Sequence, residues 1–150
     1  AVPAPDVAER FTAVLSRLGR PVIVHSCAED VPFEIFARAG VHAVAFDVSL
    51  VRPARYDALG AYLDAGGVAV LGILPGIDPA PGVREPTWKD AARPAVELID
   101  RLGFPRSVLT DRVAVSPACG LAGASAGWAR RALTVVRDVA TAFAEDPAAL

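Results

Sequence analysis

The sequence predicts an α/β fold in which parallel strands alternate with helices. Short, unbroken apolar runs recur along the 150 residues, and segments with apolar residues at helical spacing separate them. The resulting order is α-β-α-β-α-β-α-β-α, and continuous apolar strands of this kind are typical of a parallel sheet covered on both faces. Two architectures fit this order: a small doubly wound sheet, or half of an eight-stranded (βα) TIM barrel.

The first part of the chain is expected to form a helix, a strand and a second helix. Apolar residues recur at helical spacing over residues 7–18, and Gly19 fits the end of that helix. Residues 21–27 then form a predicted buried strand. A helix that starts at residue 30 or 31 follows, and Gly40 ends it.

The middle of the chain repeats the alternation. Residues 42–47 and 68–74 are continuous apolar runs and are predicted as the second and third strands. Between them, residues 53–65 carry apolar side chains at helical spacing. Gly66 and Gly67 stop this helix before the third strand begins.

The last part begins with a loop that contains four prolines. A helix over residues 88–102 and a fourth strand over residues 112–116 come next. A glycine- and alanine-rich loop leads to Ser125, which fits the N-cap of a long helix that ends near residue 144. The expected buried stripe of this last helix consists of Trp128, Ala132, Val135, Val136, Val139 and Phe143.

Composition excludes several classes of protein. Hydrophobic residues make up 53% and charged residues 21% of the chain, which suffices for a substantial core and argues against disorder. The net charge is -2, Lys89 is the only lysine and the arginines are scattered, so we expect no nucleic-acid partner. No apolar run is long enough for a membrane span, and the N-terminus lacks the pattern of a signal peptide. We expect a cytoplasmic protein whose two cysteines stay reduced.

Three side chains suggest a metal site. His25 and Cys27 end the first apolar run, and residues i and i+2 of a strand point to the same face. Cys119 follows the fourth strand, and the carboxyl ends of parallel strands form the usual site of this fold class. Two thiolates and an imidazole suit zinc, with Asp47 at the end of the second strand as a candidate oxygen ligand.

Each of these residues also has an ordinary structural interpretation. The two cysteines can be small buried apolar residues, with His25 hydrogen-bonded in the core. Asp47 can cap a turn. The glycines from Gly120 onward can offer backbone N–H groups to an anion, although Ser125 fits the helix cap better. His42, at the remote end of its strand, is expected to be solvated or packed.

Three segments resemble a known family, the cobalamin-independent methionine synthases. They are His25-Ser26-Cys27, Phe46-Asp47-Val48 and the segment from Ser116 to Leu121, and they occur in the order and near the spacing of the family's C-terminal half. Within this family, the segments resemble the short, single-barrel relatives. It implies a zinc enzyme on a TIM barrel related in fold to uroporphyrinogen decarboxylase, with His25, Cys27 and Cys119 as zinc ligands.

The chain departs from the family pattern at two positions. A gapless alignment puts the family's zinc-binding Glu at Ser49, so either Asp47 or Ser49 stands at the position of the fourth ligand, and Asp47 is the candidate carboxylate. Ser49 and Gly120 are the candidate substrate contacts. The family's catalytic His, in an Asp-x-His-Ser pattern, is replaced by Leu74. No catalytic proton donor is therefore assigned.

Trp88 follows the proline-rich loop, and it is either a cover for the site or a core residue at a helix start.

The resemblance implies a methyltransferase that acts on a thiol, in methionine biosynthesis. Homocysteine is the expected acceptor, and methyltetrahydrofolate or a methyl-carrying protein is the expected donor. The alternatives are a non-catalytic half-barrel module that binds a metal or ligand, and a metal-free relative of uroporphyrinogen decarboxylase. Zinc stoichiometry separates the methyltransferase from the metal-free relative.

Four strands are half of what a closed barrel needs. We therefore expect residues 1–150 to be a single domain, the C-terminal half-barrel of a longer chain, or else to pair with a second chain. Such a piece alone is expected to be inactive, because by resemblance the missing half supplies much of the surface that binds homocysteine and folate.

Overall fold

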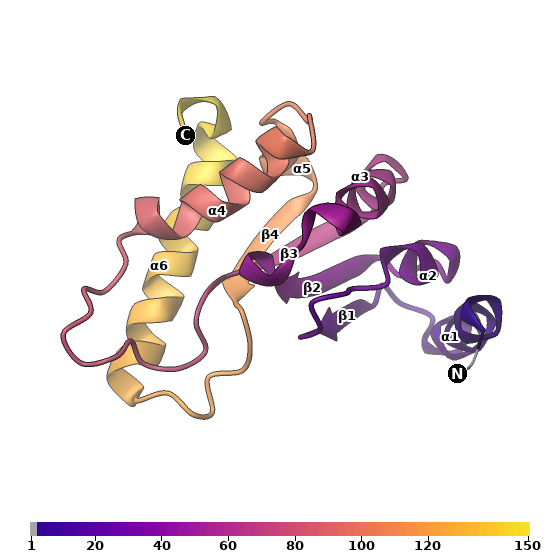
Figure 1. Ribbon diagram of the computed structural model, residues 1–150, viewed down its shortest axis with the longest axis horizontal. Coiled ribbons are helices and arrows are strands. Elements are labelled where there is room, and N and C mark those ends of the chain that lie inside the picture. The colour runs from indigo at the N-terminus through magenta and orange to yellow at the C-terminus, as the bar shows by residue number, and fades with distance from the viewer. Residues whose placement is uncertain (1–2) are drawn as a thin grey trace.

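The computed structural model describes residues 3–150 as one parallel sheet with helices packed against it (Figure 1). The strands are β1 (Ile23–Ser26), β2 (Ala43–Asp47), β3 (Val68–Leu74) and β4 (Val113–Pro117). The helices are α1 (Ala4–Leu18), α2 (Phe33–Arg38), α3 (Tyr56–Asp64), α4 (Trp88–Arg101), α5 (Val108–Asp111) and α6 (Ala126–Glu145). Three short 3-10 helices are η1 (Val48–Leu50), η2 (Pro53–Arg55) and η3 (Pro147–Ala149).

The strand order decides between the two predicted architectures. All strand pairs are parallel, and the spatial order β1-β2-β3-β4 is the order along the chain. Because crossovers between parallel strands are right-handed, strands added in one direction place their helices on one face of the sheet. A doubly wound sheet reverses its strand order and covers both faces. The α/β prediction is confirmed, and the topology is that of half a TIM barrel.

The core lies between the sheet and its helices. On the outer face, Val44 and Phe46 of β2 and Leu71 of β3 are at most 1% exposed. α4 packs on β3, and α6 packs on both β4 and α4. The predicted stripe of α6 is confirmed, since Val136 is partly buried and its other five members are buried.

The opposite, inner face of the sheet is open in the described part of the chain, which corrects the expectation of a sheet covered on both faces. Register places Ile23, Ala45, Val70 and Ala114 on this face. The Ile23 side chain is 62% exposed, and Ala114 is also exposed. β1 was predicted as buried, but it is an edge strand with its inner side uncovered. An apolar run cannot reveal whether the same chain covers both of its faces.

Most element bounds agree with the sequence predictions to within one to three residues. The difference at the start of α2 arises from Pro32, which precedes the first helical residue, Phe33. The predicted helix over residues 53–65 begins as η2 before it becomes α3. The sequence analysis missed η1, α5 and η3, which are single turns too short for apolar periodicity to indicate.

Candidate metal centre

The three predicted metal ligands lie together at the carboxyl end of the sheet. His25 is in β1, Cys27 follows β1, and Cys119 follows β4. β1 and β4 are opposite edges of the sheet, and strands spaced about 4.8 Å apart would separate them by roughly 14 Å. The chain after β4 spans this gap by crossing the end of β3, where the Ala118 N–H donates to the Leu74 carbonyl at 2.7 Å.

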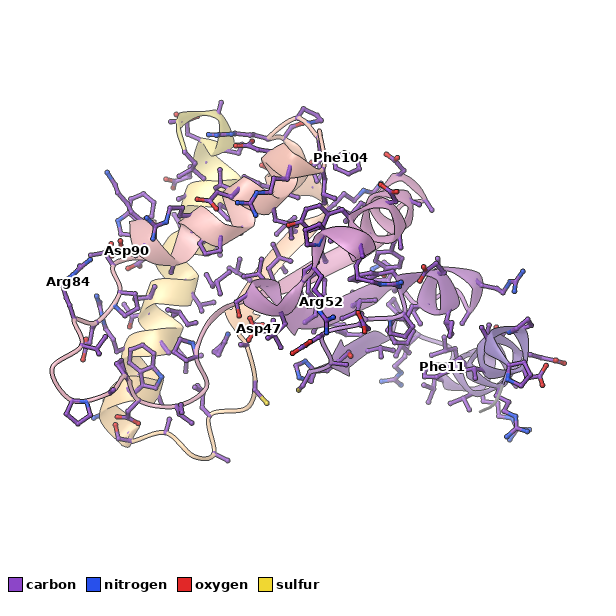
Figure 2. The ribbon with its side chains drawn as sticks, viewed as in Figure 1. Phe11, Asp47, Arg52, Arg84, Asp90 and Phe104 are labelled. Atoms are coloured by element: carbon purple, nitrogen blue, oxygen red, sulfur yellow. The ribbon has the colours of Figure 1, made fainter. Side chains whose placement is uncertain are left out.

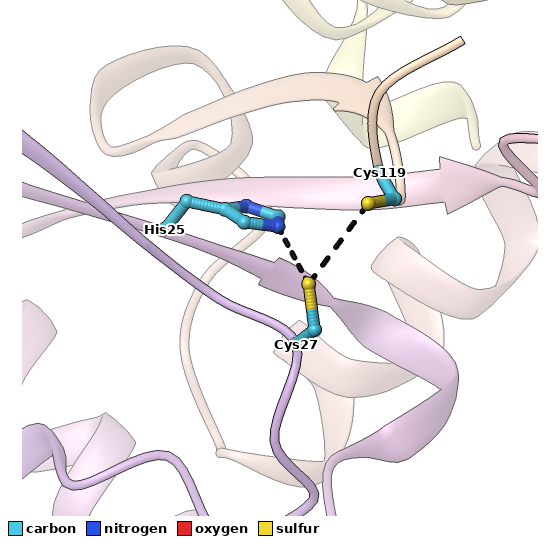
Figure 3. Close-up of side chains that lie close together, drawn as sticks. All are labelled: His25, Cys27 and Cys119. Carbon is cyan, nitrogen blue, oxygen red and sulfur yellow. Dashed lines mark hydrogen bonds between the residues drawn. The ribbon is translucent and has the colours of Figure 1, made fainter. Parts of the chain in front are cut away.

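The three candidate ligand atoms form a compact group (Figure 3). His25 Nε2 lies 2.9 Å from Cys27 Sγ, and Cys27 Sγ lies 4.0 Å from Cys119 Sγ. All three atoms fall within 4.8 Å of one another. All three residues are exposed, so the interpretation of the cysteines as buried apolar residues does not hold.

These separations fit a zinc ion. With Zn–S bonds of 2.3 Å and tetrahedral angles, two sulfurs lie about 3.8 Å apart, close to the 4.0 Å observed. A nitrogen and a sulfur on the same ion lie about 3.6 Å apart. The present 2.9 Å contact of His25 is a hydrogen bond, so the imidazole must withdraw slightly from Cys27 to admit an ion. Two sulfurs and one nitrogen leave a fourth position open, as in catalytic zinc sites.

The environment of Cys27 favours its protonated form. The hydrogen bond with Cys119 raises the pKa of the Cys27 thiol, and partial desolvation and the negative charges of Cys119 and Asp47 add to the effect. A cysteine that acts as a nucleophile on its own needs a lowered pKa. A metal ligand must also be a thiolate, so an ion that binds here would have to displace the proton of Cys27.

Asp47 lies at the end of β2 and caps η1 (Figure 2). Its Oδ1 accepts hydrogen bonds from Ser49 N at 2.8 Å and from Ser49 Oγ at 2.6 Å. Its carboxylate is outside the group of ligand atoms within 4.8 Å of one another. Both hydrogen bonds use the same oxygen, so Oδ2 is the oxygen through which a ligand role would operate.

The other sequence candidates have clear positions. Ser49 is exposed in η1 and donates to Asp47, and Gly120 is exposed directly after Cys119. Leu74, which the resemblance places where the family has its catalytic His, is 3% exposed and offers no ionisable group. His42 is exposed next to β2 at its amino end, remote from the cluster, as expected.

The loop before α6 is held by an internal carboxylate. Ser125 Oγ caps α6 by accepting from Trp128 N, as predicted. The Ser125 N–H and Oγ–H donate to Asp78 at 2.7 and 2.5 Å, and these bonds lower the pKa of the Asp78 carboxyl. The N–H of the N-cap residue Ser125 is thus already bound by a carboxylate of the chain itself.

Trp88 does not cover the His25/Cys27/Cys119 group. It lines a groove between α4 and α6 on the outer side of the sheet, with Lys89 Nζ 5.5 Å from its ring centroid. It packs partly buried against the core. The core interpretation at a helix start is therefore the one supported.

Comparison with known families agrees with this geometry. A family model described as "Cobalamin-independent synthase, Catalytic domain" matches residues 7–142, most of the chain. The chain belongs to this family. A search of curated proteins finds no match. The cobalamin-independent synthase domain is a catalytic domain of methyltransferase type, and the family is zinc-dependent. The match therefore supports the half-barrel topology and agrees with a possible metal site at the His/Cys group.

None of the helices in residues 3–150 has the length and apolar character of a membrane span.

Sequence analysis missed the residues that let the Cys119 loop cross the sheet. Gly72 lies in the middle of β3, between Asp47 of β2 and Ser116 of β4 in the register. An isolated glycine inside an apolar strand signals the close approach of another backbone, and that signal was present in the sequence. The contact of Asp78 with Ser125 had no such signal, because 47 residues separate the two.

Proposed function

We propose that this chain is the zinc-binding half of a methyltransferase that methylates a thiol, with homocysteine as the acceptor. The observation that carries the proposal is the group formed by His25, Cys27 and Cys119 at the carboxyl end of a parallel sheet. The family match supports a methionine-synthase-like domain. In its acceptor and in the transfer of a methyl group to sulfur, the proposed reaction is like that of a 5-methyltetrahydropteroyl-homocysteine methyltransferase.

The three side chains would hold the ion and leave room for a substrate sulfur. When bound, zinc allows an incoming thiol to lose its proton near neutral pH, so that the sulfur becomes a nucleophile for a methyl group. The two cysteines would donate strongly to the ion, which makes activation of water for hydrolysis less favourable. We propose Asp47 as a fourth ligand that an incoming sulfur replaces, and Ser49 and Gly120 as substrate contacts.

Leu74 bears on the identity of the methyl donor. Transfer from methyltetrahydrofolate breaks a C–N bond and forms an S–C bond, and the departing nitrogen must take up a proton. Leu74 cannot supply it, because its side chain is apolar and buried. A folate donor thus requires a proton source on another part of the enzyme. A methyl-carrying protein whose leaving group needs no proton is the second candidate, and Leu74 favours it.

A second half-barrel is proposed as the partner. The open inner face and the two sheet edges at β1 and β4 are surfaces that proteins normally cover. An N-terminal half in the same longer chain, or a second chain, would close the barrel and enclose the exposed thiols. We propose a cytoplasmic location, where two exposed cysteines with sulfurs 4.0 Å apart stay reduced.

Metal analysis of the purified protein, with thiol titration before and after chelation, tests the proposal. One zinc per chain and two thiols that become reactive on chelation are expected. Methylation of homocysteine by the completed barrel would then separate a catalytic role from a metal-binding module. Absence of bound zinc under reducing conditions, even after zinc is supplied, would leave only the alternatives without a metal.

A further inference from the structure

The contact between the two cysteines depends on a loop that lies across the sheet. Cys119 comes from the far edge strand, so residues 117–119 must pass over the end of β3 to reach Cys27. The Ala118 backbone lies directly on β3, with its N–H bonded to the Leu74 carbonyl at 2.7 Å. Figure 3 shows Cys119 above this strand, with its sulfur facing Cys27.

Gly72 provides the space for this crossing. A Cβ atom on Gly72 would overlap the Ala118 Cα, and it would lie 3.0 Å from the Ala118 Cβ and 3.1 Å from the Phe46 carbonyl oxygen. The Phe46 oxygen belongs to the neighbouring strand β2, so β3 cannot shift within the sheet to make room for the added Cβ. The Ala118 Cα belongs to the backbone, so no side-chain rotation relieves the overlap. Any side chain at this position must therefore lift the loop.

Gly76, just after β3, makes a second close backbone contact with the loop that carries Cys119. A Cβ there would lie 2.9 Å from the Gly120 carbonyl oxygen and 3.4 Å from the Cys119 carbonyl oxygen. The backbones on both sides of Cys119 thus rest on glycines. Gly123, in the same loop, differs, because its Cβ would meet only Ile77 Cγ2 at an ordinary 3.7 Å.

We infer that Gly72 is a positioning residue for Cys119: its missing side chain lets the Ala118 backbone lie on β3 and brings the Cys119 sulfur to Cys27, with Gly76 supporting the next two residues. The use of this position for zinc rests on the proposed function. The placement of the two sulfurs does not, and it can be measured without any metal.

The test uses dibromobimane, which becomes strongly fluorescent when two thiols displace both of its bromides. In metal-free, reduced protein, bridging of Cys27 and Cys119 should be at least tenfold slower in Gly72→Ala than in the wild type. Alkylation of the single thiols by iodoacetamide should change less than twofold. Zinc affinity, measured by competition with a chelator, should fall at least tenfold in the same variant.

Two control variants separate positioning from general destabilisation. Gly123→Ala alters the same loop without a clash, and Val139→Ala removes volume from the buried face of α6; both should bridge at the wild-type rate. A folded Gly72→Ala protein that bridges at the wild-type rate overturns the inference. If Gly72→Ala fails to fold by circular dichroism, Gly76→Ala decides, with slower bridging expected and an unchanged rate counting against the inference. If Gly72→Ala bridges more slowly than the wild type but the wild type binds no zinc, the proposed function is refuted and the positioning role of Gly72 stands.

Discussion

The sulfur of Cys27 lies 4.0 Å from the sulfur of Cys119, although 92 positions separate the two residues along the chain. The pair joins the two edges of the sheet, because Cys27 follows β1 and Cys119 follows β4. A metal held there would link the first and last strands. Metal binding and the stability of the half-barrel should therefore be coupled.

Removal of either sulfur should abolish stoichiometric zinc binding. Cys27→Ala and Cys119→Ala each take one thiolate from the proposed three-residue ligand set, and bound zinc should fall to about a tenth of the wild-type content or less. Zinc content after dialysis at neutral pH measures the effect. Ser26→Ala, between His25 and Cys27, is the matched control and should keep full content. Full metal content in both cysteine variants would place the site elsewhere.

Asp47 and Ser49 can be distinguished by their effects on zinc affinity. Asp47→Asn should weaken binding by about tenfold, the size of effect typical of a displaceable or outer ligand. Ser49→Ala removes the hydroxyl that donates to Asp47 at 2.6 Å and should have a smaller effect. Competition with a chelator measures both. A loss in Ser49→Ala with none in Asp47→Asn would favour the gapless alignment over the carboxylate substitution.

The sequence was sufficient to predict the proximity of His25 and Cys27, because the two-residue repeat of a strand places such residues on one face. The position of Cys119 near them followed from a fold rule on strand ends rather than from local pattern. The route of its loop could not be predicted, since the crossing depends on a backbone contact between Gly72 and Ala118. A glycine in a strand indicates some close approach, but not which segment approaches.

The open inner face was the main structural feature that the sequence could not reveal. Ile23 and Val44 both lie in apolar runs, yet their exposed fractions are 62% and 0%. The difference arises from the face to which each points and from the strand's place at an edge or inside the sheet. An apolar side chain indicates that burial is favourable, but not whether the same chain or a partner buries it.

Acid should weaken the start of α4 through Asp90. Hydrogen bonds from Thr87 and Arg84 lower the pKa of the Asp90 carboxyl to about 2 and form a capping box with Thr87. A lowered pKa in the folded state means that ionised Asp90 stabilises the fold above its unfolded value of about 3.9. This contribution is lost as pH falls toward about 2.

Urea unfolding at a series of pH values measures the Asp90 effect. In Asp90→Asn, the free energy of unfolding should fall less steeply below about pH 4 than in the wild type. Thr87→Ala should lower the free energy of unfolding by about 1 kcal/mol at neutral pH, because it removes the N-cap oxygen. Parallel pH profiles for wild type and Asp90→Asn would show that the capping box does not contribute.

The inner face should make this chain associate through Ile23. The side chain is 62% exposed beside Ala45, on the face where a closed barrel would bury it. Burial of an isoleucine contributes about 2 kcal/mol, so Ile23→Lys should raise the dissociation constant of a self-associated or half-barrel complex by about thirtyfold. Sedimentation over a range of concentrations measures this shift.

Leu133→Lys, which replaces a 56% exposed residue on α6 away from the inner face, is the matched control and should associate like the wild type. A wild-type chain that stays monomeric at every concentration and shows a closed surface in solution scattering would contradict the need for a second half, because an open apolar sheet face with two free edges is expected to find a partner.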